Sequence, residues 1–194
     1  MRYRFSLLII MIVLPALIFA ATLTVKQDGS GDYTVIQSAL DAASPGDTVL
    51  VYPGRYFENL TIQTNNITLM SLEATTGDQA YIDSTIIDGT GSVGGIIVGQ
   101  YKTDIKIIGL SITNGTSPGV ALGASSESLV RNCKIFKRTS RTGGGINVGG
   151  ATVTLSGVKI FDNYALQLGG GLYASEPSGH NTNITFDPVN RCSI

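Results

Sequence analysis

One apolar pattern repeats along the second half of the chain and limits the folds that the chain can adopt. Four segments share it: KIIGLSITN (106–114), SLVRNCKIFK (128–137), VTLSGVKIFDN (153–163) and ITFDPVNRCSI (184–194). Each segment has a late isoleucine with an apolar residue two positions before it, and the first three isoleucines are 23 and 25 residues apart. A repeat this short cannot bury its apolar side alone, so successive repeats must stack as a solenoid.

Stacking places like residues of neighbouring coils above one another, at the strand spacing of a sheet of about 4.8 Å. The pattern predicts two inward columns, Leu110/Cys133/Val158/Cys192 and Ile112/Ile135/Ile160/Ile194. Cys133 and Cys192 then lie two coils apart, roughly 9.6 Å by the same spacing, which is beyond the reach of a disulfide. We therefore expect two buried free thiols and no disulfide.

The N-terminal part of the chain has a different pattern of apolar residues. Apolar residues recur at helical spacing between Tyr33 and Ala43, which predicts a helix there, and no helical period follows residue 43. A helix at this end would cover the open edge of the first coil. With parallel crossovers being right-handed, the predicted fold class is all-β: a right-handed parallel β-helix (solenoid) with a short N-terminal capping α-helix. Because no polar cap follows Ile194, we also expect the C-terminal end to be truncated.

The first residues have the order of segments that is found in export signals. Arg2 and Arg4 precede an apolar run over 7–19, and Ala20 and Ala21 follow. This order is typical of a signal peptide, and the run is short for a membrane anchor, which needs about 20 residues. We expect a signal peptide at 1–21, a cap and first coil at 22–62 and β-helix coils at 63–194. The mature protein is then secreted or at the cell surface, with membrane contact only through the export signal.

Two stretches resemble known families. LTVKQDGSGDYTVIQSALDAASPGDTVLVYPGRYFENLTI (23–62) resembles the opening of right-handed β-helix proteins of the pectin-lyase type, and of pectin methylesterases in particular. GGGINV (143–148), IFDNYA (160–165) and GGGLYA (169–174) resemble repeats of polymorphic outer-membrane proteins and related bacterial surface β-helices. The second pattern is imperfect, because one residue rather than two separates Phe161 from Asn163.

The esterase resemblance implies catalytic residues that this sequence does not show. That family has two catalytic aspartates on neighbouring coils, a substrate-binding arginine and glutamines that hold an oxyanion, in motifs resembling QAVAL, QDTL, DFIFG and LGRPW. Val120-Ala121-Leu122 matches the end of the first motif without its glutamine, and the chain has no tryptophan for the last. We therefore predict no catalytic residue, and the chain is more simply a binding protein than an enzyme.

Scattered acidic residues give no clear metal site. Pectate lyases of this fold type bind Ca²⁺ through clustered carboxylates, and such a site needs several converging oxygens. The candidates here are Asp83, Asp88, Asp104, Glu127 and Asp162. They mostly follow strands, where Asp is a common turn former. No metal and no cofactor is expected, and Ca²⁺ stays as the alternative.

One basic cluster stands out, with five positive residues in a short stretch: Arg131, Lys134, Lys137, Arg138 and Arg141. Its functional interpretation is a binding strip for an acidic polysaccharide or surface glycan, and its alternative is a solvated face. Nucleic acid is not expected, because the formal net charge of the chain is −1. The single histidine, His180, lies in a polar insertion with no serine or cysteine motif around it, so we expect it to be exposed.

These observations leave three functions open. The first is a non-catalytic, exported β-helix passenger that binds a glycan or another partner. The second is a polysaccharide-active enzyme, of pectate lyase or pectin methylesterase type, whose catalytic coils are missing or not recognisable. The third is a structural passenger that extends another domain.

Overall fold

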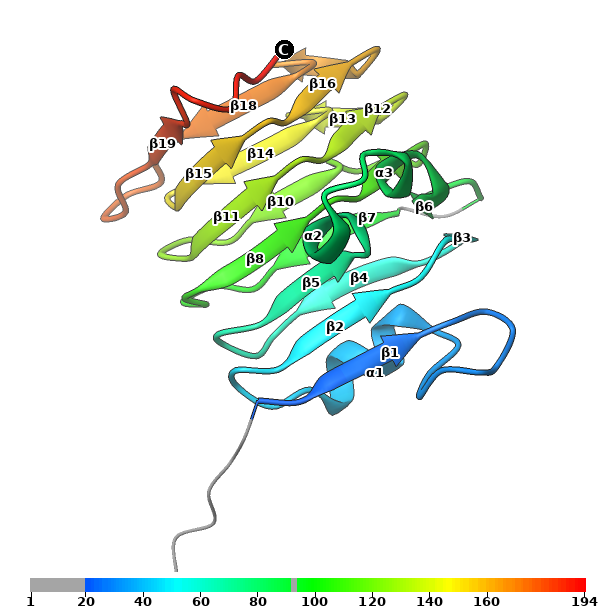
Figure 1. The fold of residues 1–194 in the computed structure, drawn as a ribbon. Helices are drawn as coiled ribbons and strands as arrows, with labels where there is room; N and C mark the ends of the chain where they lie inside the picture. Colours follow the sequence, from blue (N-terminus) through cyan, green and yellow to red (C-terminus); the bar gives the residue numbers. More distant parts are fainter. Residues whose placement is uncertain (1–19, 92–93) are drawn as a thin grey trace, which may run out of the picture.

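Three parallel sheets form the body of the protein in a computed structural model, which describes residues 20–91 and 94–194 (Figure 1). Sheet A contains β1 (Thr22–Val25), β2 (Thr48–Val51), β5 (Thr68–Ser71), β8 (Ile105–Ile108), β11 (Glu127–Arg131), β15 (Thr152–Ser156) and β19 (Asn183–Phe186). Sheet B contains β3 (Gly54–Tyr56), β6 (Thr85–Asp88), β9 (Ser111–Thr113), β12 (Lys134–Phe136) and β16 (Lys159–Phe161). Sheet C contains β4 (Asn59–Ile62), β7 (Gly95–Val98), β10 (Val120–Leu122), β14 (Ile146–Gly149) and β18 (Leu172–Ser175).

From β2 onward the chain visits the sheets in the same order, first A, then B, then C, before it rises to the next coil. Each strand inside a sheet therefore pairs in parallel with the strand one coil earlier and the strand one coil later. This is the right-handed parallel β-helix that the repeat predicts. A short pair, β13 (Thr139–Thr142) and β17 (Tyr164–Leu168), adds a fourth small sheet that the sequence pattern did not predict.

The predicted core register is confirmed, but Ile194, the last residue of the predicted inward column, is 63% exposed rather than buried. In sheet B, Ile135 pairs with both Ile112 and Ile160, and all three are almost fully buried. The bridge between Lys159 and Ser193 continues the same register into the last turn of the chain. Both cysteines are free as predicted, although only Cys133 is fully buried and Cys192 is partly exposed. Burial raises the pKa of the Cys133 thiol to about 12.

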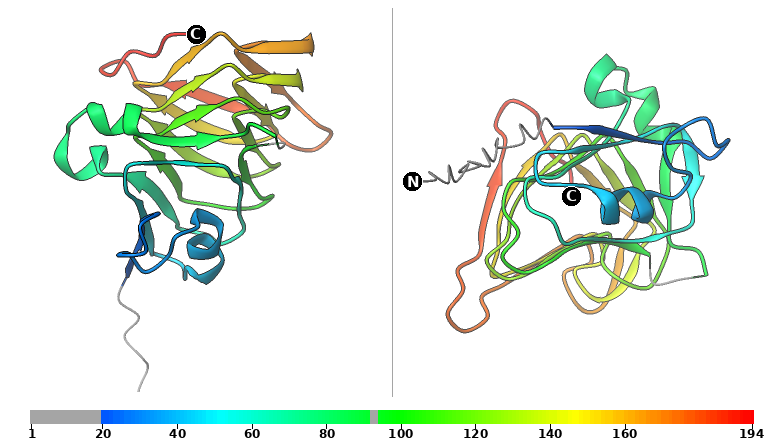
Figure 2. Two further views of the ribbon diagram at one scale, coloured as in Figure 1. Left: turned by 90° about the vertical axis from the view of Figure 1, so that its right-hand side faces the viewer. Right: turned by 90° about the horizontal axis from the view of Figure 1, so that it is seen from below.

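Helix α1 (Ile36–Ala42) covers the N-terminal end of the coils, as Figure 2 shows in the view from below. It buries Ile36, Ala39 and Leu40 in the core. It starts three residues later than predicted, because Val35 has an extended backbone. Its N-terminus is capped from a distance: the backbone N–H groups of Ile36 and Gln37 each donate to a carboxylate oxygen of Glu58 at 2.9 Å.

Two further short helices follow residue 43, where the sequence shows no helical period and predicted none. They are α2 (Glu73–Thr76) and α3 (Ala80–Ser84), inserted between β5 and β6, and α3 packs on β6 and β9. Contacts with later coils hold them, since Asn132 Nδ2 donates to Glu73 Oε1 at 2.7 Å and Lys134 pairs with Asp83. Helices of four or five residues lack enough internal hydrogen bonds to form on their own, which explains why the sequence shows no periodicity.

The glycine runs fall where coils approach closely at the entry to sheet C. Gly143 and Gly169 adopt positive φ values of 61° and 64°, which suit glycine. Gly145 precedes β14, and a Cβ there would clash with the carbonyl oxygen of Gly171 in the next coil. Glycine at these places therefore lets one coil stack on the next.

The described helices include none that is long and apolar enough to cross a membrane. The predicted signal peptide lies almost wholly outside the described residues.

Candidate functional site

The outer face of sheet C is the place where the esterase resemblance can be tested in space. Val120-Ala121-Leu122, the remnant of the first esterase motif, forms β10, with Val120 and Leu122 buried and Ala121 facing outward. Ala121 pairs with Ile97 on one side and Asn147 on the other. Thr61 and Tyr173 extend the same outward column by one coil at each end. The column offers a hydroxyl, an amide and a phenol, but no carboxylate.

The column next to it is equally free of acidic groups. Asn59 pairs with Gly95, and Gly119, Gly145 and Gly171 occupy the corresponding place in the following coils. The esterase motifs would put an aspartate on the coil after β10, where the chain reads Gly-Gly-Gly-Ile-Asn-Val from residue 143. This face can therefore donate and accept hydrogen bonds, but it holds no general base.

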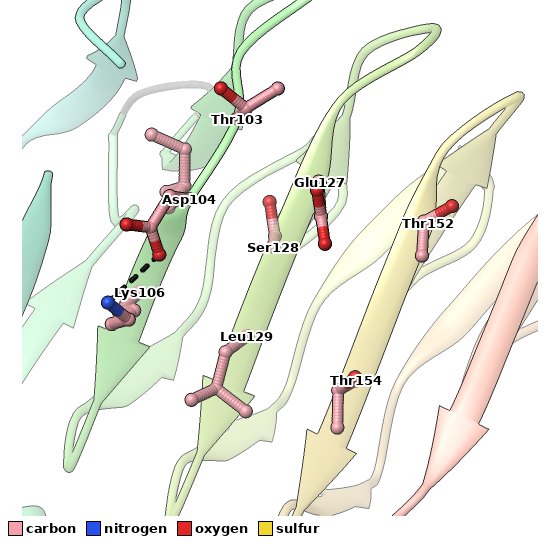
Figure 3. Close-up of a pocket in the computed structure, with 9 residues that line it drawn as sticks. Thr103, Asp104, Lys106, Glu127, Ser128, Leu129, Thr152 and Thr154 are labelled. Atoms are coloured by element: carbon pink, nitrogen blue, oxygen red, sulfur yellow. Dashed lines mark ion pairs between the residues drawn. The ribbon is translucent and has the colours of Figure 1, made fainter. Parts of the chain in front are cut away.

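A groove of about 370 Å³ lies on the outer face of sheet A, over β8, β11 and β15 (Figure 3). Asp104 and Glu127 lie on neighbouring coils, because the register pairs the next residues, Ile105 and Ser128. Asp104 also forms an ion pair with Lys106, with 2.9 Å between Lys106 Nζ and Asp104 Oδ1. The other outward side chains of the groove are Leu129, Thr152 and Thr154. It thus combines two carboxylates with one cation and hydroxyl groups.

The five acidic residues considered for Ca²⁺ do not come together. Only Asp104 and Glu127 share a surface, and Asp83 is engaged by Lys134 on the insertion. Asp162 is an exposed turn residue with a positive φ of 53°. Among the described residues no group of three or more acidic, cysteine or histidine side chains could hold a metal ion.

Asp88 is buried and fully used by its neighbours. Arg55 forms an ion pair with it, and Thr90 and Asn114 donate hydrogen bonds to Oδ1 at 2.7 and 2.8 Å. Burial alone would raise the pKa of Asp88, but these hydrogen bonds outweigh burial and lower the pKa to about 2. Asp88 is therefore an ionised structural carboxylate at the end of β6.

The predicted basic strip does not exist as one surface, and Arg138 is the reason. Its side chain is only 1% exposed and points into the turn region between sheets B and C. The guanidinium donates to the carbonyl oxygens of Thr113 at 3.1 Å and Ser117 at 2.9 Å, and also to that of Gly94. Burial lowers the pKa of Arg138 to about 10, opposed by the nearby charge of Asp88. A side chain so enclosed cannot contact a ligand on the surface.

The other four basic residues of the cluster face different directions. Arg131 and Lys134 are half-buried, the latter against Asp83, and Lys137 is exposed. Arg141 is exposed in β13, where its Nε donates to Gln167 Oε1 at 3.0 Å. Of the five, only Lys134 lies on a strand of sheet B, because Lys137 follows β12 in a turn with a positive φ of 54°.

Three residues that the cluster left out share the outer face of sheet B with Lys134. Lys159 pairs with Lys134 and Phe161 pairs with Phe136 across β12 and β16. The two phenyl rings are stacked with centroids 5.0 Å apart and planes 3° from parallel. The recurrence of KIF at 134–136 and 159–161 was the sequence signal that could have revealed this arrangement.

His180 has a serine partner that the sequence did not suggest. The polar insertion between β18 and β19 folds back over the turn column, and His180 Nδ1 lies 2.9 Å from Ser125 Oγ. The ring also contacts Tyr101 edge to face, with centroids 6.4 Å apart. These contacts leave His180 only partly exposed, so the expectation of an exposed histidine was incomplete.

Sequence relatives of the chain are plant pectinesterases. It is 36% identical over 109 residues to the Arabidopsis thaliana protein named "Probable pectinesterase/pectinesterase inhibitor 17", covering 55% of this chain and 20% of the relative. It is 33% identical over 125 residues to "Pectinesterase 2" of Citrus sinensis, covering 57% of this chain and 23% of the relative. The chain thus spans about a fifth of the length of these curated relatives.

A solved structure and a family model agree with the fold. Pectin methylesterase from carrot superposes with a TM-score of 0.51 at 18% identity, over 85% of this chain and 61% of that one. The model of the right-handed β-helix region matches residues 27–193. The stacked coils, the confirmed core register and this match over most of the length lead to one assignment: the chain belongs to the right-handed β-helix family.

Proposed function

We propose that this chain is an exported β-helix that binds polysaccharide along its outer faces and does not hydrolyse esters. The observation that carries the proposal is the outward column of sheet C, Thr61/Ile97/Ala121/Asn147/Tyr173, in a chain related to pectinesterases. This column keeps groups that bind sugar hydroxyls and lacks the acidic pair that the esterase resemblance requires. The proposed export rests on the signal peptide predicted at 1–21.

Glycan binding and ester hydrolysis need different side chains on this face. Asn147 and Tyr173 pair directly across β14 and β18, so an extended glycan can meet hydrogen-bonding groups on two successive coils. Ester hydrolysis needs an activated nucleophile or a general base within hydrogen-bond reach of the reacting group. Amide, methyl and hydroxyl side chains supply neither.

The test measures binding and catalysis on the same sample. Isothermal titration with pectin and polygalacturonate reports binding, and methanol release from highly methylated pectin reports esterase activity. We expect binding without methanol release above the blank. Methanol release abolished by Asn147→Ala would overturn the non-catalytic part, and no binding to either polymer would overturn the whole proposal.

A matched pair of tyrosine variants locates the site. Tyr173→Ala removes the phenol at the C-terminal end of the sheet C column, whereas Tyr164→Ala removes an exposed phenol from β17. We expect weaker pectin binding for Tyr173→Ala and unchanged binding for Tyr164→Ala. Equal effects of the two variants would contradict a site on sheet C.

A second candidate function is cleavage of glycosidic bonds in the sheet A groove, favoured by Asp104 and Glu127, which line it from neighbouring coils (Figure 3). Glycosidases use two carboxyl groups that flank the scissile bond. Reducing-end release from polysaccharide would support it if both Asp104→Asn and Glu127→Gln abolish that release. Absence of new reducing ends with the unmodified chain would exclude it.

A further inference from the structure

Four side chains form a cationic and aromatic surface on the outer side of sheet B, called here the Lys–Phe face. It consists of Lys134 and Phe136 from one coil and Lys159 and Phe161 from the next. The face points outward because the residues between them, Ile135 and Ile160, are buried in the core. It lies beyond α3, which packs on β6 and β9 of the earlier coils.

The aromatic half of the face is preformed. The Phe136 and Phe161 rings are stacked in parallel at 5.0 Å, and Phe161 is 43% exposed. Residues paired across neighbouring strands are held in place by the backbone ladder, so the rings need little ordering when a ligand arrives. An exposed aromatic surface next to polar groups is a feature of binding sites rather than of a solvated sheet face.

The cationic half of the face is only partly neutralised. Lys134 is paired with Asp83 of α3, and Asp162 follows Phe161 in the adjoining turn. Within residues 20–91 and 94–194, no carboxylate lies within ion-pair distance of Lys159. Lys134 and Lys159 are direct neighbours across the two strands, an arrangement that is unfavourable for like charges without a counterion. A ligand with repeated negative charges relieves that repulsion.

We propose that the Lys–Phe face is a second polysaccharide site, which binds polyuronate with free carboxylates in preference to its methyl ester. The inference rests on the proposed polysaccharide-binding function and adds the charge of the ligand. Lysine ammonium groups bind the uronate carboxylates, and the phenyl rings pack against the apolar faces of the sugar rings. Methyl esterification removes the charge while it leaves the sugar ring unchanged, so it weakens only the ionic part of the interaction.

The test compares two polymers and two matched pairs of variants by isothermal titration with the full chain. Lys159→Gln removes an exposed charge from the face, and Lys102→Gln removes a charge from a distant turn. Phe161→Ala removes an exposed ring from the face, and Phe57→Ala removes an exposed ring near the N-terminal end. All four positions are at least partly exposed, so the variants are expected to fold, and circular dichroism checks this.

We expect polygalacturonate to bind the unmodified chain more tightly than highly methylated pectin, with an affinity that falls as salt is added. Lys159→Gln should weaken polygalacturonate binding about threefold to fivefold, as for an exposed ion pair. Phe161→Ala should weaken it by about fivefold, and Lys102→Gln and Phe57→Ala should leave it unchanged.

Different failures separate the two proposals. No binding to either polymer overturns the proposed function itself. Binding that does not distinguish the two polymers, or that is the same in Lys159→Gln and Phe161→Ala as in the unmodified chain, overturns the Lys–Phe face and leaves the sheet C proposal standing. Equally tight, Lys159-dependent binding of single-stranded DNA would also overturn it, because the site would then recognise charge rather than a uronate polymer.

Discussion

The guanidinium of Arg138 donates to the carbonyl oxygen of Ser117 at 2.9 Å. This hydrogen bond links two neighbouring coils. Replacement by alanine would leave several buried carbonyl groups without donors and create a cavity. We expect Arg138→Ala to lower the free energy of unfolding by about 3 kcal/mol. Urea denaturation measures this, and exposed Arg141→Ala should change it by less than about 0.5 kcal/mol. Equal stability of the two variants would contradict the structural role of Arg138.

Asp88 gives the protein a specific pH dependence. Its pKa of about 2 in the folded state lies below the ordinary value of 3.8, so its contribution is complete above about pH 4 and is lost as the pH falls through 2. The contribution is about 2 kcal/mol. We expect Asp88→Asn to be less stable at pH 6 and to lose less stability than the unmodified chain between pH 5 and pH 2. Parallel stability curves for the two proteins would argue against this assignment.

The two cysteines should react at very different rates. Cys133 is buried with its pKa raised to about 12, whereas Cys192 is partly exposed. Thiolate is the reactive form, so a maleimide should label one thiol in the native protein and two after denaturation. Cys192→Ser should remove the native labelling. A chain without any free thiol in denaturant would mean that a disulfide exists and that the coil register is wrong.

The cap of α1 can be tested at Glu58. Its carboxylate accepts the backbone N–H groups of Ile36 and Gln37, which no local side chain caps. Loss of an N-terminal cap costs about 1 kcal/mol. Thermal denaturation should therefore show Glu58→Ala to be less stable than the unmodified chain, and exposed Glu176→Ala should serve as the unchanged control.

The features that could be predicted from the sequence are those whose buried residues recur at a regular spacing. Ile112, Ile135 and Ile160 lie in one column because a solenoid repeats the same environment in each coil, and the sequence repeats with it. The helix over 36–42 was predictable for a similar reason, since its buried residues recur at helical spacing.

Features that depend on contacts between distant segments were not predictable. Helices α2 and α3 are held by partners from later coils, such as Asn132 for Glu73. Arg138 looks like a surface residue in the sequence, and only the folded turns show the carbonyl groups that converge on it. The Lys–Phe face needed the register of β12 and β16, which places Lys159 beside Lys134.

The central claim is that this β-helix binds polysaccharide, and titration of the purified chain with polygalacturonate tests it most directly. The account predicts a saturable isotherm that weakens with added salt and with Lys159→Gln. A flat titration, in a sample shown to be folded by circular dichroism, would contradict it.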